Sequence, residues 1–220
     1  MKPVRILLKK TGLAIYISHL DMNRCLSRAV IRAKIPLWYT EGFNPKPYLN
    51  FLCPLALGQE GLAEPLDLRI EGEISNDEIK ESLSKVMPQG IEVTEVYDPV
   101  MKSAEIASAL YNITLEFENE KEAGVFCEQA KAAIESGELT AEKRSKKGMK
   151  TVNLCEMINS FEIEQQGEKA GIKTVLPTGS TLNLNPDLLL DALYEKTGLS
   201  PGSRLVSRVC LYNESGEIFR

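Results

Sequence analysis

Residues 4–34 read VRILLKKTGLAIYISHLDMNRCLSRAVIRAK, and this stretch decides how the N-terminal half of the chain folds. Two short apolar runs flank the turn Lys10-Thr11-Gly12, a pattern that is typical of a β-hairpin. Ser18 precedes Asp21 by three positions, so the serine oxygen can cap a helix start whose positive end the carboxylate favours. Apolar residues then recur at three- and four-residue steps. The stretch therefore predicts a hairpin followed by a helix over 19–34.

The rest of the first half predicts four strands and a second helix. Ser75 marks the start of that helix, because it opens a polar capping sequence before an apolar periodic run. The strands are expected at 36–40, 48–57, 64–71 and 91–97. Two helices on one face of an antiparallel sheet form the ferredoxin-like arrangement.

The segment 98–103 reads as a connection, after which the rhythm of strands and helices starts again. Helices are predicted from 120 to 136 and from 185 to about 196, and strands at 110–116, 139–146, 149–154, 161–164, 172–176 and 205–212. The sequence therefore predicts an α+β fold of two tandem ferredoxin-like units, with helices on one face of antiparallel sheets. We expect an N-terminal domain at 1–100 with a basic face and a C-terminal domain at 106–220.

The distribution of charge is uneven along the chain. The 220 residues carry a formal charge of −5, yet residues 1–50 contain nine lysines and arginines against two acidic residues. That surplus leaves the remaining residues strongly acidic. Such asymmetry is typical of a polyanion-binding face on an acidic body.

The cysteines and the termini exclude several classes of protein. Five cysteines stand far apart, with no Cys-x-x-Cys pair, which argues against a zinc ribbon, an iron–sulfur cluster or a disulfide framework. We therefore expect no metal and no cofactor. Charged residues interrupt the apolar N-terminus, and no run approaches the roughly 20 apolar residues of a membrane span. We expect a cytoplasmic protein without a membrane partner.

The predicted first helix carries two kinds of candidate side chain. His19 is the only histidine, so it is the only candidate general base near neutral pH, although a histidine in a first helical turn also serves in capping, packing or binding. Arg24, Arg28 and Arg32 fall four residues apart and share one helix face, here called the arginine stripe. This stripe suits either phosphate binding or simple solvation.

Residues 41–48, Glu-Gly-Phe-Asn-Pro-Lys-Pro-Tyr, bring aromatic rings, an amide and a lysine together in one rigid loop. Phe43 and Tyr48 could stack on bases, with Asn44 beside them and Lys46 on a phosphate, which suits single-stranded RNA. Alternatively the two aromatic residues are core residues on either side of a turn. We predict that Lys46 borders the same surface as the helix residues His19, Arg24 and Arg28.

A second basic cluster lies at the tip of a predicted hairpin. It consists of Lys143, Arg144, Lys146 and Lys147. A charge run at a hairpin tip either meets a polyanion or is simply solvated.

The string YISHLD at 16–21, the helix with Arg24 and Arg28, and the string YTEGFNPKP at 39–47 resemble the radical-SAM-linked protein family of unknown function. Residues 186–189 and 204–208 also resemble the C-terminal pattern of that family. Its members occur as free proteins or fused to a radical SAM protein, so the resemblance implies a radical SAM protein as partner. Because this chain lacks a cysteine triplet, any cluster chemistry would belong to that partner.

Together these features predict an accessory RNA-binding protein that works with a radical SAM enzyme in tRNA or rRNA modification or processing. One alternative is a protein-interaction module that docks on that enzyme without touching RNA. A second alternative is a metal-independent endoribonuclease in which His19 acts with Tyr16 and nearby arginines. The sequence favours a role without catalysis and leaves the question of an enzyme open.

Overall fold

The computed structural model describes residues 1–145, 148–179 and 182–220, and the chain divides into two compact units. The first unit consists of Met1–Glu105 together with Ile218–Arg220, and the second unit is Ile106–Glu217. The last three residues thus join the first unit, whereas the sequence prediction had placed them at the end of the second domain. The α+β class and the mostly antiparallel pairing of strands are confirmed.

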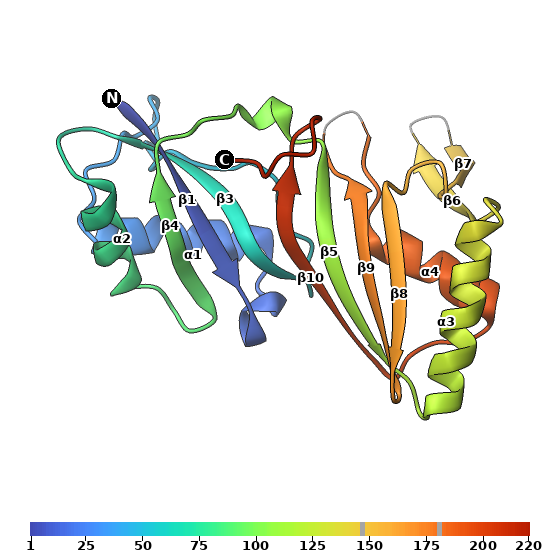
Figure 1. Ribbon diagram of the computed structural model, residues 1–220. Helices are drawn as coiled ribbons and strands as arrows, with labels where there is room; N and C mark the ends of the chain where they lie inside the picture. Colours follow the sequence, from blue (N-terminus) through green and yellow to red (C-terminus); the bar gives the residue numbers. More distant parts are fainter. Residues whose placement is uncertain (146–147, 180–181) are drawn as a thin grey trace. The chain divides into compact units, whose positions relative to one another are not determined.

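The first unit has the element order β-α-β-β-α-β (Figure 1). Its elements are β1 (Lys2–Lys10), α1 (His19–Arg32), β2 (Leu49–Phe51), β3 (Glu60–Ile70), α2 (Asn76–Ser84) and β4 (Ile91–Tyr97). The strands are antiparallel in the order β4-β1-β3-β2. In Figure 1 both helices lie behind these strands, so one face of this sheet carries the helices and the other does not.

Alternation along β1 and β3 builds the core of the first unit. Alternate residues of these strands are apolar and buried: Val4, Ile6 and Leu8 on β1, and Leu66, Leu68 and Ile70 on β3. They share one core with Met22 and Leu26 on the inner face of α1. The residues between them face the other side of the sheet, because successive side chains of a strand point to opposite faces. Arg5, Asp67 and Arg69 therefore share the face without helices.

The predicted N-terminal hairpin is wrong. Residues 12–16 form a short 3-10 helix, η1 (Gly12–Tyr16), instead of a strand. Both edges of β1 are already occupied, by β3 on one side and β4 on the other, so no edge is left for a hairpin partner. The buried ammonium of Lys10 also holds the turn, since its Nζ donates to the carbonyl oxygens of Ile15 at 3.3 Å and Ile17 at 3.0 Å.

The two strands predicted at 36–40 and 48–57 are much shorter in the structure. Only Leu49–Phe51 forms a named strand, and 36–40 contributes isolated bridges, Leu37 to Ile70 and Tyr39 to Pro47. The segment therefore forms an irregular loop beside β3.

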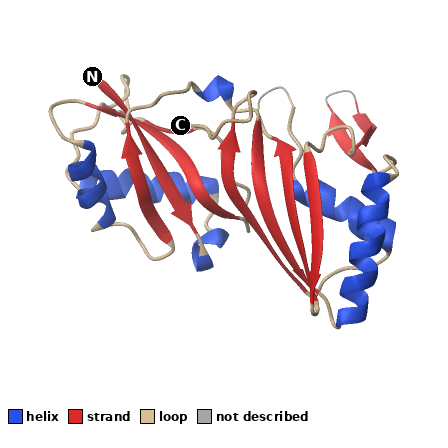
Figure 2. Ribbon diagram, viewed as in Figure 1, coloured by secondary structure: helices blue, strands red, loops and turns tan. Residues whose placement is uncertain are grey.

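The second unit contains a sheet, two long helices and a separate hairpin (Figure 2). Its elements are β5 (Ser108–Glu116), α3 (Glu120–Glu135), β6 (Thr140–Ser145), β7 (Gly148–Asn153), β8 (Ser160–Gln166), β9 (Lys169–Pro177), α4 (Pro186–Thr197) and β10 (Ser203–Tyr212). The main strands are antiparallel in the order β10-β5-β9-β8, and β6 pairs only with β7. The hairpin predicted on either side of 147–148 is thus present as β6 and β7.

A capping box starts α2 and gives a prediction about pH. Glu78 accepts hydrogen bonds from the backbone N–H of Ser75 at 2.9 Å and from its hydroxyl at 2.7 Å. These bonds, the backbone one first, lower the pKa of Glu78 below its ordinary value. The ionised Glu78 therefore stabilises the folded state at any pH above the pKa of an unfolded glutamate. This stabilisation is lost as the pH falls through the lowered pKa of Glu78 in the folded state. We expect Ser75→Ala to raise the pKa of Glu78, because the hydrogen bond from the hydroxyl is lost, and carboxyl-selective NMR titration measures this change.

Candidate functional site

The loop from Leu37 to Tyr48 folds back on itself and presents its tip to solvent. Two backbone hydrogen bonds close it, from the N–H of Thr40 to the oxygen of Lys46 at 2.9 Å and from the N–H of Tyr48 to the oxygen of Trp38 at 3.1 Å. Asn44 and Lys46 are exposed, and Phe43 is fully exposed at 106%. Phe43 is therefore not a core residue.

At the base of this loop three planar groups lie together. The guanidinium carbon of Arg69 is 4.6 Å from the ring centroid of Tyr48 and 5.2 Å from that of Trp38, and the two rings are 5.8 Å apart. Cation–π attraction favours such an arrangement. We call Trp38, Arg69 and Tyr48 the platform. Sequence reasoning found Tyr48 but missed Trp38 and Arg69, whose signals were the single tryptophan and a basic residue at an outward position of a strand.

The arginine stripe of α1 is largely occupied by local contacts. Arg24 pairs with Asp21 at 3.2 Å, and Arg32 donates to the backbone oxygen of Val86 at 3.0 Å. Arg28 is exposed and forms no hydrogen bond or ion pair with any residue that the structure describes. An exposed ion pair such as that of Arg24 with Asp21 contributes little stability, so an anionic partner could replace the carboxylate. The arginine stripe is therefore still accessible to an anionic partner.

His19 opens α1 and borders a small cavity. Its ring meets the ring of Phe51 edge-on, with centroids 4.9 Å apart and an interplanar angle of 78°. The cavity measures about 20 Å³, space for one water, and its lining also includes Lys10, Met22, Leu55 and Glu64. Burial lowers the pKa of Lys10, and the charge of Glu64 partly offsets this.

Lys10 and Glu64 were missed by sequence reasoning, although a signal existed. Lys10 stands at the next alternate position of β1 after Val4, Ile6 and Leu8, whose side chains point into the core. The alternation therefore predicts that the ammonium group of Lys10 is buried. The cavity beside it has no room for a substrate larger than water, and the described residues hold no group of three histidine, cysteine, aspartate or glutamate side chains that could bind a metal ion.

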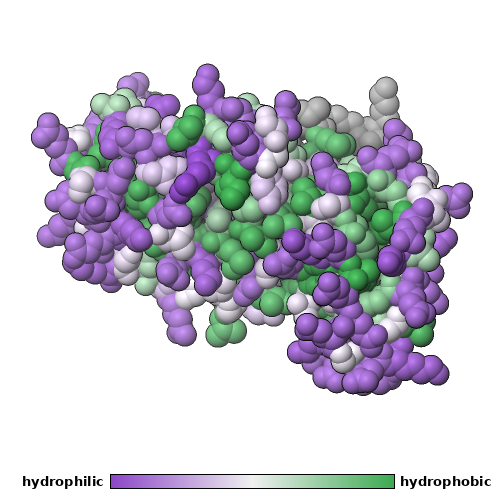
Figure 3. Space-filling model, viewed as in Figure 1, coloured by the Kyte–Doolittle hydropathy of each residue, from purple (hydrophilic) through white to green (hydrophobic). Residues whose placement is uncertain are grey.

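Tyr48 and the arginine stripe belong to opposite faces of the sheet of the first unit. The arginine stripe belongs to α1, which packs on the face that carries Leu68, whereas the neighbouring Arg69 points to the opposite face with the platform. Figure 3 views the first unit from the side on which its strands lie in front of α1, and apolar surface (green) is visible there among hydrophilic residues (purple). The platform thus stands apart from the stripe.

The second basic cluster is only partly placed. Lys143 and Arg144 lie in β6 of the hairpin, where the backbone of Lys143 pairs with Lys150 and that of Arg144 with Met149. Lys146 and Lys147 lie outside the described residues.

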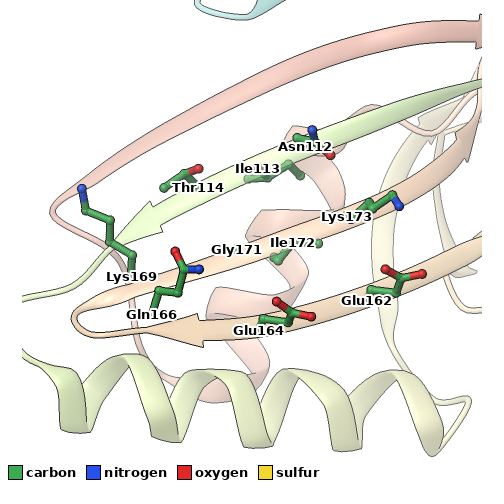
Figure 4. Close-up of a pocket in the computed structure, with 10 residues that line it drawn as sticks. All are labelled: Asn112, Ile113, Thr114, Glu162, Glu164, Gln166, Lys169, Gly171, Ile172 and Lys173. Carbon is green, nitrogen blue, oxygen red and sulfur yellow. The ribbon is translucent and has the colours of Figure 1, made fainter.

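The second unit has a shallow hollow of about 440 Å³ on the outer face of its sheet (Figure 4). Gly171 lies at its centre and has no side chain to fill it. Polar side chains from three adjacent strands surround it: Asn112 and Thr114 of β5, Lys169 and Lys173 of β9, and Glu162, Glu164 and Gln166 of β8. Because both charges are present around it, the hollow favours no one class of ligand, and no sequence motif pointed to it.

None of the helices in the described part of the chain is long and apolar enough to cross a membrane. No curated protein matches the chain.

Among solved structures, one chain of a Cbf5-Nop10-Gar1 complex is similar at 11% identity with a TM-score of 0.48, covering 96% of this chain and 50% of that one. The chain thus spans about half the length of that relative. An unknown protein from Galdieria sulphuraria is similar at 11% identity with a TM-score of 0.28, covering 94% of this chain and 98% of that one. Residues 4–186 match the family described as an uncharacterized protein conserved in bacteria (DUF2344), and the chain belongs to this family.

Proposed function

We propose that this protein is an accessory RNA-binding protein that works with a radical SAM enzyme in tRNA or rRNA modification or processing. One observation carries the RNA part: the platform of Trp38, Arg69 and Tyr48 stands at the base of a loop whose tip is the exposed Phe43. The partner enzyme rests on the resemblance of the strings at 16–21 and 39–47 to the radical-SAM-linked family.

The chemistry of this loop favours single-stranded RNA over a duplex. Aromatic faces and guanidinium planes stack on bases only where those bases are unpaired and accessible. Lys46 is exposed in the same loop, three residues after Phe43, and can meet the phosphate of a stacked nucleotide. In a duplex the faces of the paired bases are stacked on each other, so the loop could contact only the sugar–phosphate backbone.

We also propose that both units are ferredoxin-like domains. The first unit supports this with its β-α-β-β-α-β order and its strand order β4-β1-β3-β2. The second unit has the corresponding strand order, β10-β5-β9-β8, with the β6–β7 hairpin inserted. A four-stranded sheet whose aromatic residues stack bases is a recurring RNA-binding arrangement, and this likeness is an analogy of architecture.

The proposal predicts a specific effect of Phe43→Ala. Because the ring is fully exposed, its loss leaves the melting temperature unchanged, while RNA affinity falls by about 1–3 kcal/mol for one lost stacking contact. The measurement is fluorescence anisotropy with a mixed-sequence single-stranded RNA, beside the same sequence as a duplex. Leu13→Ala is the matched control, since Leu13 is 86% exposed on η1 and far along the chain from the loop.

The same assay separates this proposal from the interaction-module alternative. If the wild-type protein binds no RNA, the RNA part of the proposal fails. Recovery of the radical SAM protein from the native cell, and its loss with the double variant Arg24→Ala and Arg28→Ala, would then assign the arginine stripe to that partner. Equal affinity of Phe43→Ala and wild type for RNA would remove the loop as the binding site.

A further inference from the structure

Arg5 is the most deeply buried charged residue of the first unit, with an exposed fraction of 1%. It lies on β1 between two neighbours in register, Asp67 on β3 and Tyr97 on β4. Its Nε and Nη2 donate to the two carboxylate oxygens of Asp67, at 2.7 and 3.0 Å. This fork fixes the plane of the guanidinium on the sheet face that also carries Arg69.

The C-terminal segment Ile218–Arg220 covers this guanidinium. The ring of Phe219 lies over Arg5, with its centroid 4.6 Å from the guanidinium carbon, and is itself 4% exposed. Arg220 pairs with Glu95 and lies over the ring of Tyr97 at 5.4 Å. The segment thus places one aromatic ring on Arg5, much as Tyr48 and Trp38 lie on Arg69.

Two buried polar atoms beneath this segment lack a hydrogen-bond partner among the described residues. They are Nη1 of Arg5 and the hydroxyl oxygen of Tyr97. The guanidinium of Arg220 also acts on the Tyr97 hydroxyl, but a guanidinium can only donate, so no described residue accepts the hydroxyl proton of Tyr97. Buried donors are nearly always paired in folded proteins, and leaving one unpaired is costly. The contact with Phe219 therefore leaves two donors that an acceptor could still satisfy.

We propose that Arg5 and Tyr97 form a nucleobase subsite that Phe219 occupies until RNA displaces it. The inference rests on the proposed RNA-binding function and extends it to a second position. A base that replaces Phe219 keeps the stack on Arg5, and a carbonyl oxygen on the edge of that base accepts from the hydroxyl of Tyr97, while Nη1 of Arg5 is left to donate to an oxygen in the plane of the guanidinium. Asp67 and Arg69 are two residues apart on one strand face, so this subsite continues from the platform and, like the platform, takes unpaired bases.

Tyr97→Phe tests the subsite without disturbing the fold. The substitution removes a buried hydroxyl whose proton no described residue accepts, so the melting temperature is expected to change little. Affinity for oligouridine, whose bases carry carbonyl oxygens, is expected to fall about five- to tenfold, with a smaller fall for oligoadenine. Unchanged affinity for both RNAs would overturn the subsite.

Phe219→Ala tests the displacement. If the ring competes with a base for Arg5, its removal raises oligouridine affinity at least about twofold, provided that the melt shows a folded protein. Equal or weaker binding by this folded variant contradicts the competition. A wild-type protein that binds no RNA defeats the proposed function itself, whereas a wild type that binds RNA equally to both variants defeats only this inference.

Discussion

Phe126→Ala is expected to destabilise the second unit by about 3–5 kcal/mol, the usual cost of removing a buried phenylalanine side chain. Phe126 has an exposed fraction of 0% on the inner face of α3. Its ring lies 5.0 Å from that of Phe117, the residue that follows β5, and 6.1 Å from that of Tyr194 in α4. The ring therefore joins the sheet and both long helices, and alanine would leave a cavity among them.

Urea unfolding followed by circular dichroism measures this loss. Glu128→Ala is the control, because Glu128 is exposed on the same helix and such surface changes stay within about 0.5 kcal/mol. A loss below about 1 kcal/mol for Phe126→Ala would mean that the three rings do not form the centre of this core.

Local sequence signals located the helices well because each helix carries its own start signal. The predicted start at 19 agrees with α1, whose N-cap Ser18 accepts from the N–H of Asp21. Ser75 likewise caps α2, and Asn185 with Pro186 starts α4. A cap and the first turn are three or four residues apart, so the sequence contains both halves of the interaction.

Strand pairing was harder to predict because it depends on residues far apart in the sequence. The run Leu13–Ile17 looks like a strand, but only the positions of β3 and β4 show that β1 has no free edge for it. The strand predicted at 36–40 forms only isolated bridges for a related reason, since Pro36 and Pro47, the bridge partner of Tyr39, have no N–H to donate.

The candidate site shows the same division. The loop 41–48 was recognisable from its composition, and the exposure of Phe43 rules out a core position for that residue. The partner of Tyr48, in contrast, is Arg69, and the partner of Arg5 is Asp67, each on a strand distant in sequence. From the sequence alone, an arginine at an outward position of a strand is predicted to be exposed to solvent. Only the structure shows that a ring or a carboxylate lies beside it.

The pairing of Arg5 with Asp67 leads to the last prediction, for the first unit. Asp67→Ala would leave the buried guanidinium with no carboxylate, so that Nε and Nη2 join Nη1 as unsatisfied donors. Removing one partner of a buried pair costs 3–5 kcal/mol, and we expect about 3 because the 21% exposed side chain of Asp67 lets water reach the site.

Asp67→Asn is the matched control, since its amide keeps one oxygen acceptor for Arg5 and should cost less than the alanine variant. Replacing both residues, with Arg5→Met and Asp67→Leu, removes the charge together with its partner and should recover most of the stability. Urea unfolding of the three variants decides the matter. If Asp67→Ala and the double variant are equally destabilised, the loss comes from packing and not from an uncompensated charge. In that case Arg5 is held in place by Phe219 and the surrounding strands, and its orientation toward a base would not depend on Asp67.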